Sequence, residues 1–555
     1  MVARPPEGPA LNRRRLAAVA AAVAGLVLLA AVGWALVDRQ GAWDFVRGYA
    51  AAPAGASSGR EDEVARGARL FAWGDFGALN TDAMQSVAVP WKVASTALLM
   101  AHTPPGEPLS AGQLPAILQR YGFLHPTRLV GLEATAPGDT LGLVRGTAVR
   151  HVPPLAVEIA NTGCAACHAG VGYDAQGLPK TDEAWLGSPN TSIHLQAYSE
   201  DVYAALRQAM RDEPALLAAV REVWPQTTAR EAATLRAVIL PLARRRIAEL
   251  EAAGRGPLPF ANGPPGITNG VAALKLQTKG LASPELEHGH TAIPELADRT
   301  WRSALLYDGA YAPPQGARFR PMRPVDLTSG HRDQLAAITT FFTVPTMGQS
   351  PERARAAVPD GRAVMAFLAT RRPQPFPGDL DEAAAARGRR VYDAGCAACH
   401  GTYDAAPRPR LTGFPNWCGD VGTDRARLDA MSPDLVRRIK ASVYSGLLSA
   451  AHTACYAAPP LTGLWSSAPY LHNGSVPTLT QLFGLEPRAT RFTVGGHALD
   501  LQRVGISYPQ GYRPWSAPGE IDTAKPGFGN VGHEREFAGL TPAQKRDLLE
   551  FLKTL

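Results

Sequence analysis

Two copies of one hexapeptide decide how this chain of 555 residues is organised: Gly163-Cys-Ala-Ala-Cys-His168 and Gly395-Cys-Ala-Ala-Cys-His400. Each contains C-x-x-C-H, the attachment motif of c-type haem. Two cysteines three positions apart at the start of a helix project to one side, where their sulfurs can form thioether bonds to one porphyrin. The histidine that follows lies under the iron as its proximal ligand. The sequence therefore predicts two covalent haem c groups, held by Cys164, Cys167 and His168 and by Cys396, Cys399 and His400.

Other uses of paired cysteines fit the sequence less well. Two C-x-x-C pairs can build one zinc site, but such pairs normally lie about 15–20 residues apart, and here the copies are 232 residues apart. A thioredoxin-like redox motif needs a strand–helix context and no histidine. The repeated histidine favours haem in both copies.

The two remaining cysteines are Cys418 and Cys455. Because they are left over in even number, we expect a disulfide between them, which would add about 3–4 kcal/mol to stability on a chain-entropy estimate. Two free buried thiols are the alternative.

Composition and charge narrow the class of protein. Apolar residues make up 46% and charged residues 19%, which is typical of a globular chain and excludes a disordered or fibrous one. A net charge of +7 is small at this length, and we expect no nucleic-acid partner. Four haem propionates would offset part of it.

The N-terminus suggests a membrane anchor. Residues 1–15 end in three arginines, and Leu16–Val37 is an uncharged apolar run long enough to cross a bilayer. The arginines place the N-terminus in the cytoplasm, so the haem domains would lie in the periplasm, held at the inner membrane. A long signal peptide, with a soluble periplasmic or secreted product, is the alternative.

The rest of the chain predicts a mainly α fold with two cytochrome c-like haem domains and long loops. Helical periodicity runs through 61–73, 91–100, 111–121, 201–253, 332–342, 381–394 and 540–555. Proline-rich Arg371–Leu380 marks the main joint. The expected organisation is a cytoplasmic N-terminus (1–15), an anchor (16–37), a linker (38–62), an N-terminal haem domain (63–375) and a C-terminal one (376–555).

Four stretches resemble a known family: AARGRRVYDAGCAACHGTY (385–403), PLTGLWSSAPYLHNGSVPTL (460–479), the GNVGHE segment with the helix after it (529–555), and GSPNTSIHLQAYSEDVY (187–203). They look like the bacterial di-haem cytochrome c peroxidase superfamily, and most like its rubber oxygenase-containing branch. The resemblance implies that the N-terminal haem meets peroxide or dioxygen. It also implies that the C-terminal haem is six-coordinate and relays electrons from a small cytochrome c or cupredoxin.

The resemblance also suggests the second axial ligand of the C-terminal haem. Family peroxidases carry a methionine, and one relative a tyrosine, about 14 residues after the position of His472; the region near Glu486 has neither. The rubber oxygenase branch uses a histidine near the C-terminus, which His533 matches. We expect His533 as the ligand, with His472 as the alternative; otherwise His472 would support a propionate or the proximal histidine.

The N-terminal haem has no obvious sixth ligand. His194, His288, His290 and His331 are weak candidates, and an open iron is the default. Trp301 could relay electrons between the haems or be a packed aromatic side chain. Arg302, Arg318, Arg320 and Arg323 could pair with propionates or lie on a solvated face.

Three functions follow from these expectations. The first is an oxidoreductase of peroxidase type. The second is an oxygenase that cleaves an apolar unsaturated substrate. The third is an electron carrier without substrate chemistry, which would need both irons to be six-coordinate.

Overall fold

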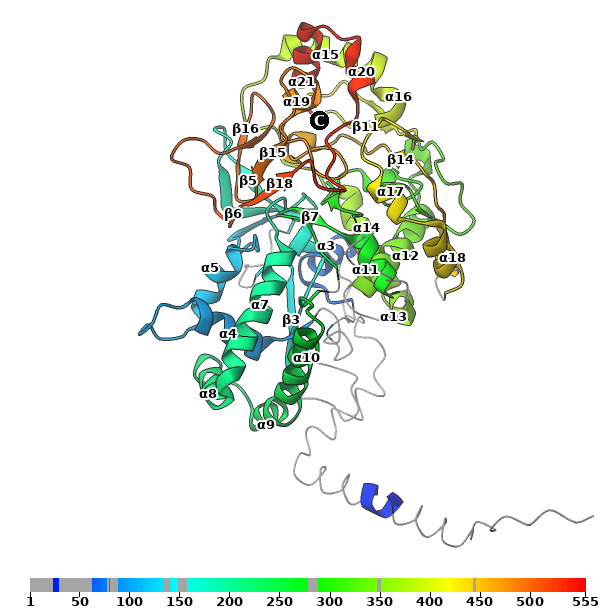
Figure 1. The fold of residues 1–555 in the computed structure, drawn as a ribbon. Helices are drawn as coiled ribbons and strands as arrows, with labels where there is room; N and C mark the ends of the chain where they lie inside the picture. Colours follow the sequence, from blue (N-terminus) through cyan, green and yellow to red (C-terminus); the bar gives the residue numbers. More distant parts are fainter. Residues whose placement is uncertain are drawn as a thin grey trace, which may run out of the picture.

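The computed structural model describes residues 23–28, 62–76, 79, 88–132, 140–147, 157–258, 260–277, 288–346, 351–442 and 446–555. Helices and small sheets alternate along the chain (Figure 1). The expectation of a mainly α fold is wrong, because the described residues form two three-stranded sheets and several two-stranded ones. Most of their strands have two to five residues, and the longest, PKTDEAWL at 179–186, shows no alternation of apolar and polar residues that would predict a strand.

The two larger sheets enclose the first cysteine motif. One has the antiparallel order β1 (Val89–Pro90), β4 (Glu158–Thr162), β3 (Leu143–Thr147). The other has the order β2 (Arg128–Val130), β6 (Pro179–Leu186), β5 (Ala169–Tyr173), with β2 parallel to β6. The motif helix α6 (Cys164–Cys167) joins β4 to β5, so both sheets fix its position.

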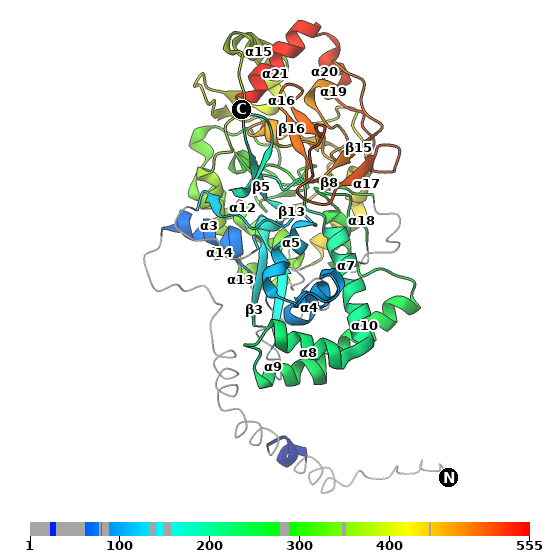
Figure 2. The same ribbon diagram turned by 90° about the vertical axis from the view of Figure 1, so that its left-hand side faces the viewer.

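Two helix crossings of the same kind lie in different parts of the molecule (Figures 1 and 2). Helix α3 (Glu63–Trp73) packs on α14 (Val358–Thr370), and α15 (Glu382–Gly395) packs on α21 (Pro542–Lys553). Each crossing depends on a glycine: a Cβ on Gly67 would overlap the Ala363 carbonyl oxygen, and one on Gly388 that of Asp547.

An aromatic pair follows one turn after each of these glycines. The ring centroids of Phe71 and Phe367 are 5.6 Å apart, and those of Tyr392 and Phe551 are 5.1 Å apart. The C-terminal helix α21 thus packs on the helix before the second motif, and Thr541 is its N-cap.

A helical lobe lies at the lower end of the molecule in Figure 1. It contains α4 (Trp91–His102), α7 (Leu195–Ala209), α8 (Glu213–Val223), α9 (Ala229–Thr234), the π-helix η4 (Leu235–Ile239) and α10 (Leu240–Ala252). The helices predicted over 201–253 are thus confirmed. Their apolar faces form one core with β3 and β4.

Apart from α12 (Ser329–Thr346), which has 18 residues, the other elements are short. They are η2 (Ala111–Gln113), α5 (Leu114–Gln119), β7 (Ile267–Thr268), α11 (Gly270–Gln277), β8 (Thr291–Ala292), η6 (Arg299–Trp301), β9 (Tyr311–Ala312), η7 (Pro324–Asp326), α12 (Ser329–Thr346), α13 (Pro351–Ala356), α16 (Ala397–His400), β10 (Thr402–Tyr403), β11 (Leu411–Gly413), β12 (Cys418–Gly419), α17 (Ala426–Ala430), α18 (Pro433–Lys440), β13 (Ser449–Ala450), β14 (Tyr456–Ala457), η9 (Leu464–Ser466), α19 (Leu479–Leu482), β15 (Arg491–Val494), β16 (Ala498–Asp500), β17 (Gly505–Ser507), β18 (Gly519–Asp522), α20 (Glu534–Ala538) and the 3-10 turn η3 (Met210–Asp212).

The two halves of the chain are interleaved in the cores. The core around α3 and α14 includes Leu435 and Ile439 of α18, from the second half. The core around α15 and α21 includes Trp301 and Met322, from the first half. Strand β9 also pairs with β13 across the halves. The division between residues 375 and 376 stays a prediction, and packing crosses it in both directions.

The transmembrane anchor predicted at residues 16–37 is corrected. Within the part of the chain that the structure describes, no helix combines the length and apolar character needed to cross a bilayer. Of that stretch the structure describes residues 23–28, which are helical, and the remainder lies outside the described residues. The inner-membrane location inferred from the anchor is withdrawn with it.

Candidate functional site

The two motif histidines are held by the same kind of contact. Nδ1 of His168 lies 3.2 Å from the carbonyl oxygen of Pro294, and Nδ1 of His400 lies 2.8 Å from that of Pro459. A carbonyl can only accept, so each Nδ1–H donates. This fixes the tautomer in which the other nitrogen, Nε2, is free to bind a metal.

The two prolines are the fourth residues of matching segments, 291–312 and 456–477, in which each residue corresponds to the one 165 positions later. Asp298 and Gly463 both adopt left-handed backbone and begin the short helices η6 and η9. The bridge between Leu305 and Tyr311 corresponds to the bridge between Tyr470 and Val476. The chain therefore builds the same support twice.

The matching segments also bind each other reciprocally. The Ala292 amide donates to the His472 carbonyl at 2.8 Å, and the Ala457 amide donates to the Tyr307 carbonyl at 2.7 Å. Ala457 is the counterpart of Ala292, and His472 is the counterpart of Tyr307. The rings of Tyr307 and His472 meet with centroids 6.3 Å apart. The segments are thus related by an approximate twofold axis.

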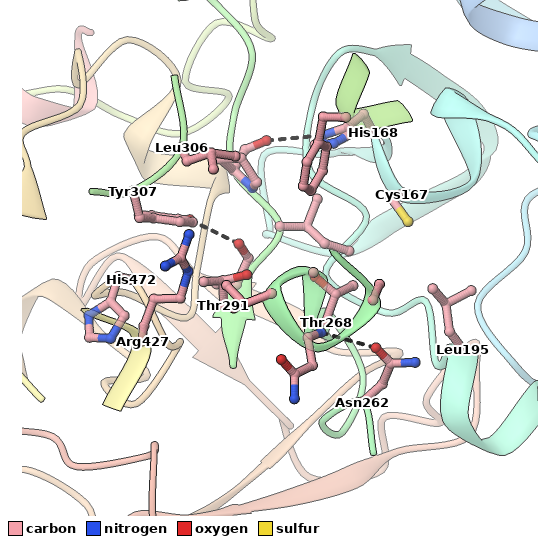
Figure 3. A pocket seen from close by; sticks show the side chains of 18 of the residues that line it. Cys167, His168, Leu195, Asn262, Thr268, Thr291, Leu306, Tyr307, Arg427 and His472 are labelled. Carbon is pink, nitrogen blue, oxygen red and sulfur yellow. Dashed lines mark hydrogen bonds between the residues drawn. The ribbon is translucent and has the colours of Figure 1, made fainter. Parts of the chain in front are cut away.

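We call the elements around His168 the first module: α3, α6, residues 291–312 and α14. Those around His400 form the second module: α15, α16, residues 456–477 and α21. A cavity of about 1510 Å³ extends through both modules and is lined by Cys167, His168, Cys399 and His400 among others. In Figure 3, Cys167 and His168 lie on one side of this space, and Tyr307, Arg427 and His472 on another.

In the second module an imidazole faces the motif histidine. The ring centroids of His400 and His533 are 6.3 Å apart, with ring planes inclined by 27°. Metal–imidazole bonds are about 2 Å long, so two imidazoles on opposite sides of one metal have ring centres about 6 Å apart. Nδ1 of His533 is buried without a hydrogen-bond partner. Burial lowers the pKa of both histidines to about 4, which keeps them neutral, as metal ligation requires. The residues present therefore fit a haem with two histidine ligands.

The local backbone fixes His533 in this place. It has left-handed backbone, with φ of 67°, at the N-cap of α20. Its amide donates to the Val421 carbonyl at 2.9 Å. The adjacent Glu534 binds both Arg488 at 2.6 Å and the Gly532 amide. The loop is therefore fastened on both sides of the imidazole.

His472 is placed differently from the alternative considered above. Its Nε2 lies 2.9 Å from the Tyr456 hydroxyl, and its Nδ1 lies 3.4 Å from the Thr423 hydroxyl. With both ring nitrogens engaged, the side chain has no nitrogen free for iron. Its partners are these hydroxyls, and the motif histidine is not among them.

The first module has no such imidazole partner among the described residues. His168 pairs with no other ring there, and the four weak candidates, His194, His288, His290 and His331, do not line the cavity. Nδ1 of His194 accepts from the Ala197 amide at the start of α7. Nε2 of His331 bonds to the Thr300 carbonyl at 2.8 Å. His290 packs on Phe528.

Trp301 lies in the core of the second module, 6% exposed, and does not line the cavity. Tyr307, which does line it, lies near His472 on the side of the cavity away from His168 (Figure 3). Sequence reasoning missed Tyr307 and the two proline acceptors. The signal was present in the 165-residue correspondence between LLYDGAY (305–311) and YLHNGSV (470–476), which shares a leucine and a glycine.

Of the four arginines considered for propionates, Arg302 lines the cavity. Arg318 donates to the carbonyls of Gly309 and Ser449. Arg320 and Arg323 both bind Asp326.

Cys418 and Cys455 form a disulfide in the structure. The bond joins β12 to β14, which also pair as strands. These strands adjoin Val421, which holds the His533 amide, and Tyr456, which holds His472. The disulfide therefore braces the loops that hold His533 and His472.

Comparisons with known proteins agree with this geometry in one region. Residues 455–493 match the RoxA-like, cytochrome c-like family. This RoxA-like segment contains Pro459, η9 and His472, the support of the second motif. It implies haem c and a haem-containing oxidoreductase or electron-transfer role.

Two curated relatives come from Sinorhizobium fredii (strain NBRC 101917 / NGR234). The uncharacterized protein y4iJ is 37% identical over 114 residues, which is 18% of this chain and 18% of that protein. The uncharacterized protein y4iM is 27% identical over 234 residues, which is 34% of this chain and 52% of that protein. The matches span about half of these relatives' length or less.

Proposed function

We propose that this protein is a di-haem c-type oxidoreductase of the peroxidase-like kind, in which the first module meets peroxide or dioxygen and the second relays electrons. The observation that carries the proposal is the difference between the modules: His400 faces His533, whereas His168 faces no second imidazole among the described residues.

The proposal of two haems per chain rests on the duplicated segments that hold the motif histidines. Each motif histidine donates to a proline carbonyl at the same place in a repeated segment, and each module contains the same glycine-dependent helix crossing. The shared cavity, about 1510 Å³, exceeds the 300–1,000 Å³ typical for one small ligand. When bound, the haems would supply redox chemistry at the first site and electron storage at the second.

The side chains of this protein orient and insulate that chemistry. Pro294 and Pro459 fix the motif histidines as neutral ligands. Tyr307 of the first module meets the His472 ring of the second, with centroids 6.3 Å apart, and donates its hydroxyl to the Ala292 carbonyl at 2.9 Å. We assign to Tyr307, rather than Trp301, the position of an aromatic relay between the sites.

The second motif lies where a small electron-donor protein, a cytochrome c or cupredoxin, could approach. Ala394, Gly395 and Ala398 are exposed around it. In the first motif, by contrast, Ala165 and Ala166 are 2% and 1% exposed. Electrons from a donor would therefore enter at the second module.

Oxygenation of an apolar substrate is the second candidate function. The cavity extends from Cys167 between α7 and α10, where Leu195, Val202, Ile239 and Leu250 line it. Arg245, Arg246 and Glu249 of α10 also line the cavity. The apolar side chains among them would suit an apolar organic substrate better than peroxide alone.

The test is electron paramagnetic resonance of the holoprotein, wild type and His533→Ala. We expect one high-spin and one low-spin ferric haem in the wild type, with the high-spin signal altered by peroxide or by dioxygen after reduction. His533→Ala should convert the low-spin signal to high-spin. Two low-spin haems inert to both reagents would instead support an electron carrier, and an unchanged spectrum in the variant would remove His533 as a ligand.

A further inference from the structure

Two arginines line the cavity near the boundary between the modules without a carboxylate partner. Arg299 and Arg302 lie three positions apart at the short helix η6. Residues at this spacing in a 3-10 helix lie on the same side. Neither makes an ion pair with any carboxylate of the described residues.

Arg302 is the more deeply enclosed of the two, at 3% exposed. Its guanidinium donates to the carbonyls of Ala304, Leu306 and Ala458, at 3.3, 3.3 and 3.4 Å. These are long contacts to neutral acceptors. Burial and the nearby Arg299 lower the pKa of Arg302 to about 9. A buried cation with only such partners is costly unless an anion completes its surroundings.

The neighbouring carboxylates are already engaged. Asp308 pairs with Arg427 at 3.0 Å, and both side chains are buried. Glu295 pairs with Arg371 and also accepts the Ala297 amide at 2.8 Å. Arg299 itself donates to the Glu295 backbone carbonyl at 2.9 Å, which brings no charge.

The two arginines are also a departure from the repeat. Their counterparts 165 positions later are Leu464 and Ser467, in the same short helix of the second module. The fold of this segment therefore does not need cations at these positions. Since the first module carries them where the second does not, their reason lies in what the cavity contains.

We propose that Arg299 and Arg302 form a carboxylate-binding site at the boundary between the modules, and that it binds haem propionates. The inference rests on the proposed function, because it needs haem in the cavity. Through the Ala458 carbonyl, next to the Pro459 that holds His400, Arg302 also contacts the second module's support. The site therefore connects the charged carboxylates of the cofactor, through the two arginines, to the backbone of both modules.

Charge around a haem is one of the factors that set its reduction potential. A cation beside a propionate offsets its negative charge and favours the reduced haem. Removing the cation leaves the carboxylate uncompensated and stabilises the oxidised haem. The effect is measured as a potential and needs no substrate.

The experiment is a spectroelectrochemical titration of the full-length holoprotein carrying Arg302→Gln or Arg299→Gln. The matched control is Arg318→Gln, which also removes an arginine that donates to backbone carbonyls but does not line the cavity. Covalent haem per chain is measured in parallel as the pyridine haemochrome. Arg299→Gln serves if Arg302→Gln fails to fold, since Arg299 has a single carbonyl contact.

When two haems are retained, we expect each cavity variant to lower the reduction potential of at least one haem by about 59 mV. For one electron, this is about a tenfold change in the equilibrium between the oxidised and the reduced haem. Arg302→Lys, which keeps the charge, should lie closer to the wild type than Arg302→Gln. Potentials unchanged in both Gln variants, or lowered equally by Arg318→Gln, would overturn the carboxylate site. A wild type without two haems would overturn the proposed function instead.

Discussion

Individual residues set the chemistry of each site through backbone contacts that are remote in sequence. Pro294 lies 126 positions after His168, and Pro459 lies 59 positions after His400. The cysteines and histidines of the two motifs stand out in the sequence because C-x-x-C-H is a local pattern, and their role in haem attachment stays a prediction. The proline acceptors could not be predicted, since nothing in the sequence indicates which carbonyl reaches a histidine. Tyr307 could not be singled out either, since no local pattern shows which aromatic side chain lines a cavity.

A buried histidine outside the two candidate sites should make stability depend on pH. His497 is 1% exposed, and its Nδ1 accepts the Gly495 amide while its Nε2 lies 3.4 Å from the Thr191 hydroxyl. Burial lowers its pKa to about 4. Below pH 6.5 the unfolded chain gains a proton that the folded protein excludes, so stability falls as the pH drops towards 4, by about 3 kcal/mol from this residue.

His497→Gln should flatten that dependence. The measurement is the urea midpoint of the holoprotein at pH 7.5 and pH 5, for the variant and the wild type. The wild type should lose more stability on acidification than the variant. Equal losses would show that His497 does not carry the effect.

Elements were predictable where periodicity is long. The helices at 61–73, 91–100, 201–253, 381–394 and 540–555 appear close to their expected ranges. Helix α14 was missed, because its sequence begins Val-Pro-Asp-Gly, which resembles a turn more than a helix. The short strands around the first motif carry too few residues for a period, so the sheets could not be predicted either.

The glycine-dependent crossing of α15 and α21 gives a prediction at this scale. Gly388→Ala should lower stability by about 1–3 kcal/mol, because the added methyl group overlaps the Asp547 carbonyl and forces the helices apart. The control is Gly330→Ala in α12, where the nearest atom lies 3.9 Å away, and where helix propensity favours alanine.

Thermal unfolding of the two glycine variants decides between these expectations. Gly388→Ala should melt below the wild type, and Gly330→Ala at or above it. Equal melting temperatures for Gly388→Ala and the wild type would mean that the crossing tolerates a side chain.

The whole molecule is two interlocked modules, which the sequence indicated only through its duplicated hexapeptide. Two features could not be predicted from the sequence, because each joins segments that are distant in the chain. One is the exchange of hydrogen bonds between residues 291–312 and 456–477, and the other is the presence of α18 residues in the first module's core. The sequence placed a boundary at Arg371–Leu380, where α14 ends, yet contacts on both sides pass over it.

Haem stoichiometry tests the molecule at this scale. Cys164→Ala and Cys396→Ala should each reduce covalent haem from two to one per chain, seen as a halved pyridine haemochrome signal. The haem retained by Cys164→Ala should keep the low-spin spectrum of the His400–His533 site. Full haem content in either variant would contradict the assignment of that motif.

The unequal exposure of the two motifs has a consequence for how the protein is made. Ala165 and Ala166 are enclosed between two sheets, whereas α16 has no buried residue. A maturation enzyme that joins vinyl groups to thiols must therefore reach the first motif before the surrounding strands assemble. The second motif stays open before and after that assembly, so we expect only the amino-terminal attachment to be tied to an early stage of folding.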